Sequence, residues 1–109
     1  LEGWIKHGFY LSFYFMLKAS VMLEESKDIN QKNLIYKQIM REIIQEGGDT
    51  DTNACIIGGM VGAFLGYTNL PEEMTHKVLN FNCEEMGIPR PNLFNTKMNL
   101  VPNLKKLIE

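Results

Sequence analysis

The chain has 109 residues, which is enough for one domain and too few for two. Hydrophobic residues make up 45% and charged residues 22% of the sequence, values that are ordinary for a soluble globular protein. The net charge of -2 gives no basic surface for nucleic acid or an anionic membrane, so we expect neither as a partner.

The two cysteines, Cys55 and Cys83, both lie inside helical patterns. They have neither the spacing of a disulfide framework nor that of a zinc site, and we therefore expect a reducing, cytoplasmic compartment. The chain begins at Leu1 rather than at Met. We therefore expect a processed, truncated or partial polypeptide, from which a targeting segment could have been removed.

The most apolar part of the sequence is a predicted helix from Gly3 to about Leu23, followed by a polar break. Its longest uncharged run, Gly8–Leu17, is ten residues, whereas a membrane span needs roughly 20. A helix that is apolar nearly all round is one that other helices surround, and the rest of the chain offers only three or four. We therefore expect an absent partner to pack on Gly3–Leu23, either an N-terminal half or another chain. A membrane-surface helix is the alternative.

A second helix is predicted from Asp28 to about Gln45. The Asp28 carboxylate can accept free amide hydrogens of the first turn, in a capping box with Gln31. Gly47 or Gly48 suits the left-handed residue that closes a helix. The predicted apolar stripe has steps of three and four: Tyr36, Ile39, Met40, Ile43 and Ile44.

A third helix is predicted from about Asn53 to Tyr67, and small residues recur along it. Glycine stands at every fourth position, at Gly58, Gly62 and Gly66. Each glycine costs about 1 kcal/mol of helix stability relative to alanine. The repeat therefore predicts that another helix or a ligand approaches this backbone closely.

A fourth helix is predicted from Pro71, because proline suits the first helical position and the two glutamates after it suit an acidic first turn. It is expected to end near Gly87. Residues 88–91 break the chain, and a short helix is predicted from about Pro102. No segment alternates with the period of a strand, so the sequence predicts an all-α fold.

The second and third helices are joined by Gly47-Gly48-Asp49-Thr50-Asp51-Thr52-Asn53. Asp49, Asp51 and Thr52 offer only oxygen ligands, which hard divalent cations such as Mg²⁺, Mn²⁺ or Ca²⁺ prefer. Two carboxylates two positions apart in a non-helical loop can turn toward one ion. The segment is therefore a candidate metal site.

The alternative interpretation of this segment is a helix cap. Asp51 or Thr52 could accept hydrogen bonds from the amides of Ala54 or Cys55, and the residues alone leave both interpretations open. An EF-hand is excluded, because it needs glycine where Ala54 stands and glutamate where Met60 stands.

The loop and its surroundings resemble the C-terminal part of the ADP-ribosylglycohydrolase family. The residues that carry the resemblance are Gly47 to Ala54, Gly58, Gly62-Ala63, Gly66, Leu70 to Glu73, Gly3 to His7, and Arg90-Pro91. The resemblance implies an all-α domain of orthogonally packed helices, of which residues 1–109 form a C-terminal part. It also implies a site for two Mg²⁺ ions, or Mn²⁺, with Asp49, Asp51 and Thr52 among the ligands.

The activity implied by the resemblance is Mg²⁺-dependent hydrolysis of the glycosidic bond between ADP-ribose and a modified protein side chain or small molecule. Two family motifs, an early Gly-Asp and a Thr-Asp-Asp-Thr, have no match here, and Met74 stands where many members have Trp. Those motifs supply other ligands and the acidic residues beside the scissile bond. We therefore expect the catalytic residues in an absent N-terminal part, and this chain alone to be inactive. The alternative is a structural or interaction protein that keeps the fold without the chemistry.

Overall fold

A computed structural model describes residues 5–26, 28–81, 87 and 101–108 of the chain. Their elements, in order, are α1 (Ile5–Glu25), a 3-10 turn (Ile29–Gln31), α2 (Lys32–Gln45), α3 (Thr50–Leu65), a second 3-10 turn (Tyr67–Asn69), α4 (Glu72–Asn80) and α5 (Val101–Ile108). These residues include no strand, so the predicted all-α class is confirmed. The chain divides into two units, residues 1–71 and 72–109.

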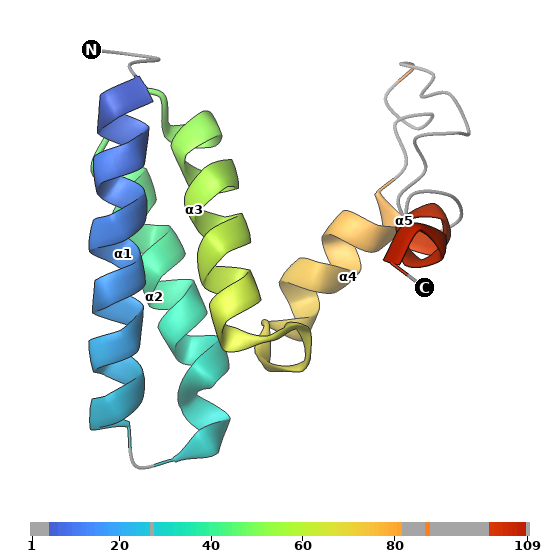
Figure 1. Cartoon of the computed structure of the whole chain (residues 1–109), viewed down its shortest axis with the longest axis horizontal. Helices are drawn as coiled ribbons and strands as arrows, with labels where there is room; N and C mark the ends of the chain where they lie inside the picture. The colour runs from blue at the N-terminus through green and yellow to red at the C-terminus, as the bar shows by residue number, and fades with distance from the viewer. Residues whose placement is uncertain (1–4, 27, 82–86, 88–100, 109) are drawn as a thin grey trace. The chain divides into compact units, whose positions relative to one another are not determined.

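The first unit is a bundle in which α1, α2 and α3 lie side by side and alternate in direction (Figure 1). Each helix contributes three buried residues spaced four apart, which places them on one face of that helix. This core consists of Leu11, Phe15, Ala19, Ile35, Ile39, Ile43, Ile57, Val61 and Leu65.

The predicted stripe of α2 is confirmed at four of its five positions. Ile39 and Ile43 are buried, and Tyr36 and Met40 pack against the core. The prediction that Ile44 is buried is wrong, because its side chain is 59% exposed. The predicted stripe also left out Ile35, which is buried. The line of contact runs along positions four apart, and Ile44 is turned from it by one helical step of about 100°.

The helix α1 continues to Glu25, beyond the predicted end at Leu23. Among the described residues only one face of α1 is covered, and the absent partner expected on Gly3–Leu23 stays a prediction. The other face exposes large apolar side chains: Ile5, Phe9, Tyr10, Phe13, Tyr14, Leu17 and Val21. Within the described ranges, no helix has the length and apolar character needed to cross a membrane.

Asp28 caps the 3-10 turn that precedes α2, whereas it was expected to cap α2 itself. The Asp28 carboxylate accepts a hydrogen bond from the Asn30 amide at 2.9 Å, which caps the 3-10 turn before α2. Gln31 does not complete a capping box, because its side-chain oxygen instead accepts a hydrogen bond from the Ser26 hydroxyl at 3.1 Å.

The glycine face of α3 is closely approached, as predicted. A Cβ at Gly58 would lie 3.1 Å from both the Met40 sulfur and the Tyr36 hydroxyl oxygen. The Tyr36 hydroxyl also donates a hydrogen bond to the Gly58 carbonyl at 3.3 Å. The helix ends at Leu65 rather than Tyr67, because Gly66 has a φ of 90° and leaves the helical conformation.

The second unit contains α4 and α5. The helix α4 starts one residue after Pro71 and has Glu72 and Glu73 in its first turn, as predicted. It ends at Asn80, and the predicted extension toward Gly87 lies mostly outside the described residues, as do the predicted break and irregular tail. The short helix expected from Pro102 is confirmed and starts at Val101.

A pair of glycine substitutions tests the close approach to α3. Gly59→Ala should stabilise the protein by about 1 kcal/mol, because its Cβ meets nothing within 4 Å and alanine is the better helix former. Gly58→Ala should lose this gain, because Met40 and Tyr36 must shift to admit the methyl group. Urea unfolding measures both free energies. Equal gains for the two variants would contradict the packing described here.

An ion pair between α1 and α2 predicts a pH dependence of stability. The Lys18 ammonium donates a hydrogen bond to the Glu42 carboxylate, and this bond lowers the pKa of Glu42. A carboxyl whose folded pKa is lowered stabilises the fold above its unfolded pKa, and this stabilisation is lost as the pH falls through the folded pKa. Both side chains are partly exposed, so the pair should contribute less than about 1 kcal/mol.

The pH dependence is tested with Glu42→Gln. The control variant is Glu24→Gln, which removes a carboxylate at the C-terminal end of α1. In urea unfolding, Glu42→Gln should lower the free energy of unfolding at pH 7 and leave it nearly unchanged at pH 3. Glu24→Gln should show little difference at either pH. A Glu42→Gln loss that is as large at pH 3 as at pH 7 would show that the ion pair is not its cause.

Candidate metal centre

The α2–α3 loop is a turn of two consecutive left-handed glycines. The φ angles of Gly47 and Gly48 are 75° and 70°, which L-residues with a Cβ rarely adopt. The predicted glycine stop of α2 is therefore confirmed, and the turn delivers the chain directly to Asp49, the N-cap residue of α3.

The helix α3 begins at Thr50, three residues before its predicted start at Asn53. The Asn53 amide donates to the Asp49 carbonyl at 3.0 Å, which closes the first helical turn. Asp51 and Thr52 therefore belong to the first turn of a helix and not to an extended loop. Acidic side chains are stabilised there by the partial positive charge of the helix N-terminus.

The Asp49 and Asp51 side chains stand close together, at the N-cap and in the first turn of α3. The hydrogen bond with the Asp49 side chain, followed by that from the Thr52 amide at 2.9 Å, lowers the pKa of Asp51. Asp51 is exposed to solvent, so water screens the repulsion between the two carboxylates, and a cation bound between them would relieve it further. Of the three predicted ligands, the two aspartates are thus brought together.

The cap interpretation in its predicted form is wrong. Asp49 occupies the cap position, yet its side chain makes no capping hydrogen bond. The Asp51 carboxylate bonds the amide of its neighbour Thr52, in place of the predicted amides of Ala54 or Cys55. The Asp49 carboxylate is therefore not occupied by helix capping.

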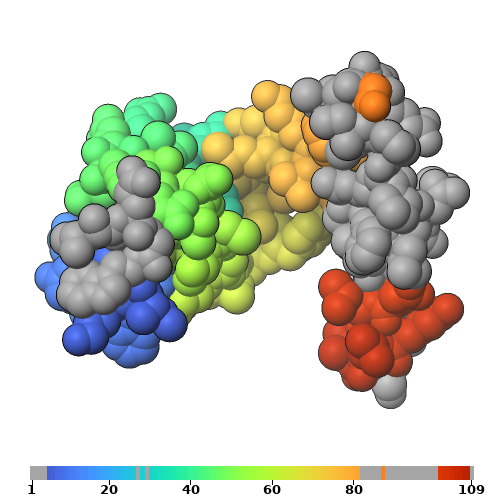
Figure 2. Space-filling model, turned by 90° about the horizontal axis from the view of Figure 1, so that it is seen from above, coloured from blue at the N-terminus to red at the C-terminus, as the bar shows by residue number. Residues whose placement is uncertain are grey.

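Asp49 and Thr52 face a groove of about 560 Å³ between α1 and α3. Asn53 shares this face, because positions 49, 52 and 53 are spaced by three and four along the helix. Figure 2 views the end of the bundle where the blue surface of α1 and the green surface of α3 adjoin. The other lining residues, mostly apolar, are Ile5, Gly8, Phe9, Ser12, Phe13, Ile56 and Met60.

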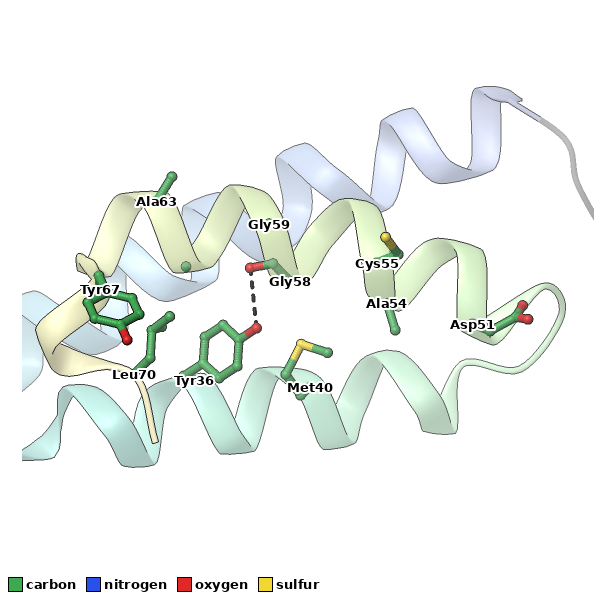
Figure 3. A pocket seen from close by; sticks show the side chains of 11 residues that line it. Tyr36, Met40, Asp51, Ala54, Cys55, Gly58, Gly59, Ala63, Tyr67 and Leu70 are labelled. Carbon is green, nitrogen blue, oxygen red and sulfur yellow. Dashed lines mark hydrogen bonds between the residues drawn. The ribbon is translucent and has the colours of Figure 1, made fainter. Parts of the chain in front are cut away.

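Asp51 lines a second groove, of about 630 Å³, between α2 and α3. Figure 3 shows Asp51 at one end of this groove and Tyr67 at the other, with Gly58 and Gly59 between them. Cys55, which is free and exposed, also lines it. The three predicted ligands thus lie on two sides of α3, with Asp49 and Thr52 at one groove and Asp51 at the other.

The chemistry of this set suits a hard cation, because carboxylates and a hydroxyl are oxygen donors. It is an incomplete set. Within the described residues, no group of three or more His, Cys, Asp and Glu side chains is placed to hold a metal ion. Mg²⁺ is commonly bound through one or two carboxylates with water in its remaining positions, which is what Asp49 and Asp51 could provide.

Comparison with known proteins agrees with this fold and loop. The sequence profile of the ADP-ribosylglycohydrolase family matches residues 1–100, and the chain belongs to that family. A predicted ADP-ribosyl glycohydrolase of Acanthamoeba polyphaga mimivirus is 44% identical over 55 residues. These residues are 50% of this chain and 16% of the mimivirus protein, so the chain matches only a small part of that relative. No solved structure matches the chain significantly.

Sequence reasoning missed Asn53 and the aromatic residues as parts of the site. The sequence predicted a helix that starts at Asn53, and the side of a helix that its first residue faces cannot be predicted from such a start. Starting α3 at Thr50 places Asn53 on the face of Asp49 and Thr52. The earlier start of α3 could have been predicted from the few residues between Gly48 and the apolar part of the helix, because they leave little room for a loop.

Gly47 provides a test of the turn that presents Asp49. Gly47→Ala should destabilise the protein by about 1–2 kcal/mol, because alanine resists the left-handed conformation. Gly47→Asn should cost less, since asparagine tolerates this conformation better. A Cβ at Gly47 meets nothing within 4 Å, so the loss measured by urea unfolding reports the backbone alone. Equal stability of Gly47→Ala and wild type would contradict the left-handed turn.

Proposed function

We propose that this chain provides part of the metal site of an enzyme that hydrolyses the glycosidic bond of ADP-ribose. The bond would link ADP-ribose to a modified protein side chain or to a small molecule. The observation that carries the proposal is the position of Asp49 at the N-cap of α3 and of Asp51 in its first turn, in a chain of the ADP-ribosylglycohydrolase family.

The metal in this proposal is Mg²⁺, with two ions in the complete site, or Mn²⁺ in its place. Asp49, Asp51 and Thr52 would be ligands from this chain. Bound ions of this kind can orient sugar hydroxyls and a water molecule. The distribution of residues favours a ligand that lies along the α1–α3 groove, because Asp49 and Thr52 form its polar end.

The apolar part of the groove favours the rest of an ADP-ribose molecule. The rings of Phe9 and Phe13 have centroids 4.8 Å apart and an interplanar angle of 52°. Together with Ile56 and Met60 they offer an apolar wall. A flat heteroaromatic base can gain contact with such a surface, whereas the carboxylates favour neutral hydroxyl groups over phosphates.

The general acid or base of the reaction is assigned to chain outside residues 1–109. The exposed apolar face of α1 supports this assignment, because residues such as Tyr10, Leu17 and Val21 form an apolar surface that water does not favour. We propose that an N-terminal half or a partner chain covers this face and brings the remaining ligands to Asp49 and Asp51. A cytoplasmic location is proposed as well, supported by the free thiol of Cys55.

The second candidate function is a non-catalytic structural or interaction protein. It is favoured by the incomplete ligand set around Asp49 and Asp51 and by the same exposed face of α1. The two functions differ in one respect that can be measured. The enzyme needs a divalent cation at Asp49 and Asp51, whereas a structural protein needs only the packing of α1.

The proposed metal site predicts the effect of neutralising either aspartate. Asp49→Asn and Asp51→Asn should each weaken Mn²⁺ or Mg²⁺ binding at least about tenfold, because an amide gives a cation far less charge than a carboxylate. Isothermal titration calorimetry measures the affinity. ADP-ribose release by a protein that contains these residues should fall with it.

The matched control is Asp28→Asn, since asparagine can still cap the 3-10 turn at which Asp28 stands. It should leave cation affinity unchanged. Equal cation affinity of the wild type, Asp49→Asn and Asp51→Asn would refute the metal assignment and favour the structural alternative.

A further inference from the structure

The α1–α3 groove contains a buried amide that the fold itself does not use. Asn53 is 7% exposed, and Ser12 is the other buried polar residue in the described part of the chain. The Ser12 hydroxyl donates to the Gly8 carbonyl at 2.7 Å. The Asn53 side chain forms no hydrogen bond within the described ranges, so its amide is free to bind a ligand or water.

The Asn53 amide opens into the groove. Among the described residues, no fully enclosed side-chain nitrogen or oxygen lacks a partner, so the amide has access to the groove that Asn53 lines. Its Oδ1 atom lies 3.4 Å from the point where a Cβ of Gly8 would stand. Because Gly8 has no side chain, no Cβ from α1 stands against this oxygen.

The surroundings of Asn53 restrict the group that it can bind. Asp49 and Thr52 lie on the same face of α3, and Phe9 and Ile56 continue the groove on its apolar side. A phosphate next to Asp49 would be repelled by the carboxylate. A primary amide offers donors and an acceptor, which a pair of sugar hydroxyls can satisfy at once.

We propose that Asn53 is a specificity-determining residue that binds the hydroxyl groups of a ribose unit in the α1–α3 groove, next to Asp49 and Thr52. The inference rests on the proposed function and adds to it a residue outside the metal ligands. In the free protein water in the groove can pair the amide, and the ligand hydroxyls take its place on binding. Asn53 therefore contributes to ligand affinity rather than to the stability of the free protein.

The test is calorimetric titration of the full-length protein that contains residues 1–109 with ADP-ribose in saturating Mg²⁺. Asn53→Ala should weaken ADP-ribose binding at least about tenfold while leaving Mn²⁺ affinity and the midpoint of thermal unfolding unchanged or slightly raised. Asn33→Ala makes the same substitution at an exposed position of α2 and should change none of the three measurements.

A second variant tests the inference from the opposite wall. In Gly8→Ala the new methyl group would cover the Asn53 Oδ1 atom at an ordinary contact distance. ADP-ribose affinity should again fall, although Asn53 is retained and helix α1 gains a better helix former.

The outcomes separate this inference from the proposed function. Wild-type binding that Asn53→Ala leaves unchanged would overturn the role of Asn53 and retain the proposed function. Absence of ADP-ribose binding by the wild-type full-length protein would overturn both. Failure of Asn53→Ala to fold would assign the amide a structural role and overturn the inference.

Discussion

The close packing of α3 against α1 and α2 is the constraint on which the rest of the structure depends. Ile57 and Val61 are fully buried between the other two helices. On the α2 side, the Tyr36 hydroxyl reaches the Gly58 carbonyl, and the same burial raises the pKa of Tyr36. A side chain larger than hydrogen at position 58 would require its neighbours to shift. The glycines of α3 therefore set its distance from α2, at a cost in helix propensity that tertiary packing offsets.

This packing determines where the acidic residues lie. Because α3 is held against α1 along its length, its first turn stands beside the start of α1. The two left-handed glycines bring the chain to that point with Asp49 at the N-cap position. Asp49 and Thr52 then face the groove, and Asp51 reaches the Asp49 carboxyl group from the neighbouring side of the helix. Carboxylates at a helix N-terminus are favoured electrostatically, and a cation between them would be favoured further.

The sequence predicted the helical elements of this fold well, because local signals determine them. Periodicity identified Ile39 and Ile43 as core, and Gly47 marked the end of α2. The start of α3 was misplaced, because the N-cap residue Asp49 makes no side-chain capping bond and the expected capping signal was assigned to later residues. An excess of apolar surface on α1 was expected from the sequence, but which face stays uncovered could not be predicted, since it depends on which helices of the chain pack around it.

The candidate site was predictable only in part. Asp49, Asp51 and Thr52 were selected because their side chains carry oxygen atoms and because the sequence resembles the family. The match of the family profile over residues 1–100 confirms that the chain belongs to this family. Asn53 was not selected, because its role depends on the position of Gly8 on another helix. Contacts between helices that are distant in the sequence carry no local signal, and only the packing of α1 on α3 reveals them.

The central claim is that Asp49 and Asp51 form a cation site. It is tested most directly by recording the amide resonances of the ¹⁵N-labelled chain during titration with Mn²⁺, whose unpaired electrons broaden nearby signals. We expect substoichiometric Mn²⁺ to broaden the amide signals of residues 48–53 first and Mg²⁺ to reverse the effect by competition. Broadening that begins at other amides, or that is equal near all exposed carboxylates, would contradict a cation site at Asp49 and Asp51.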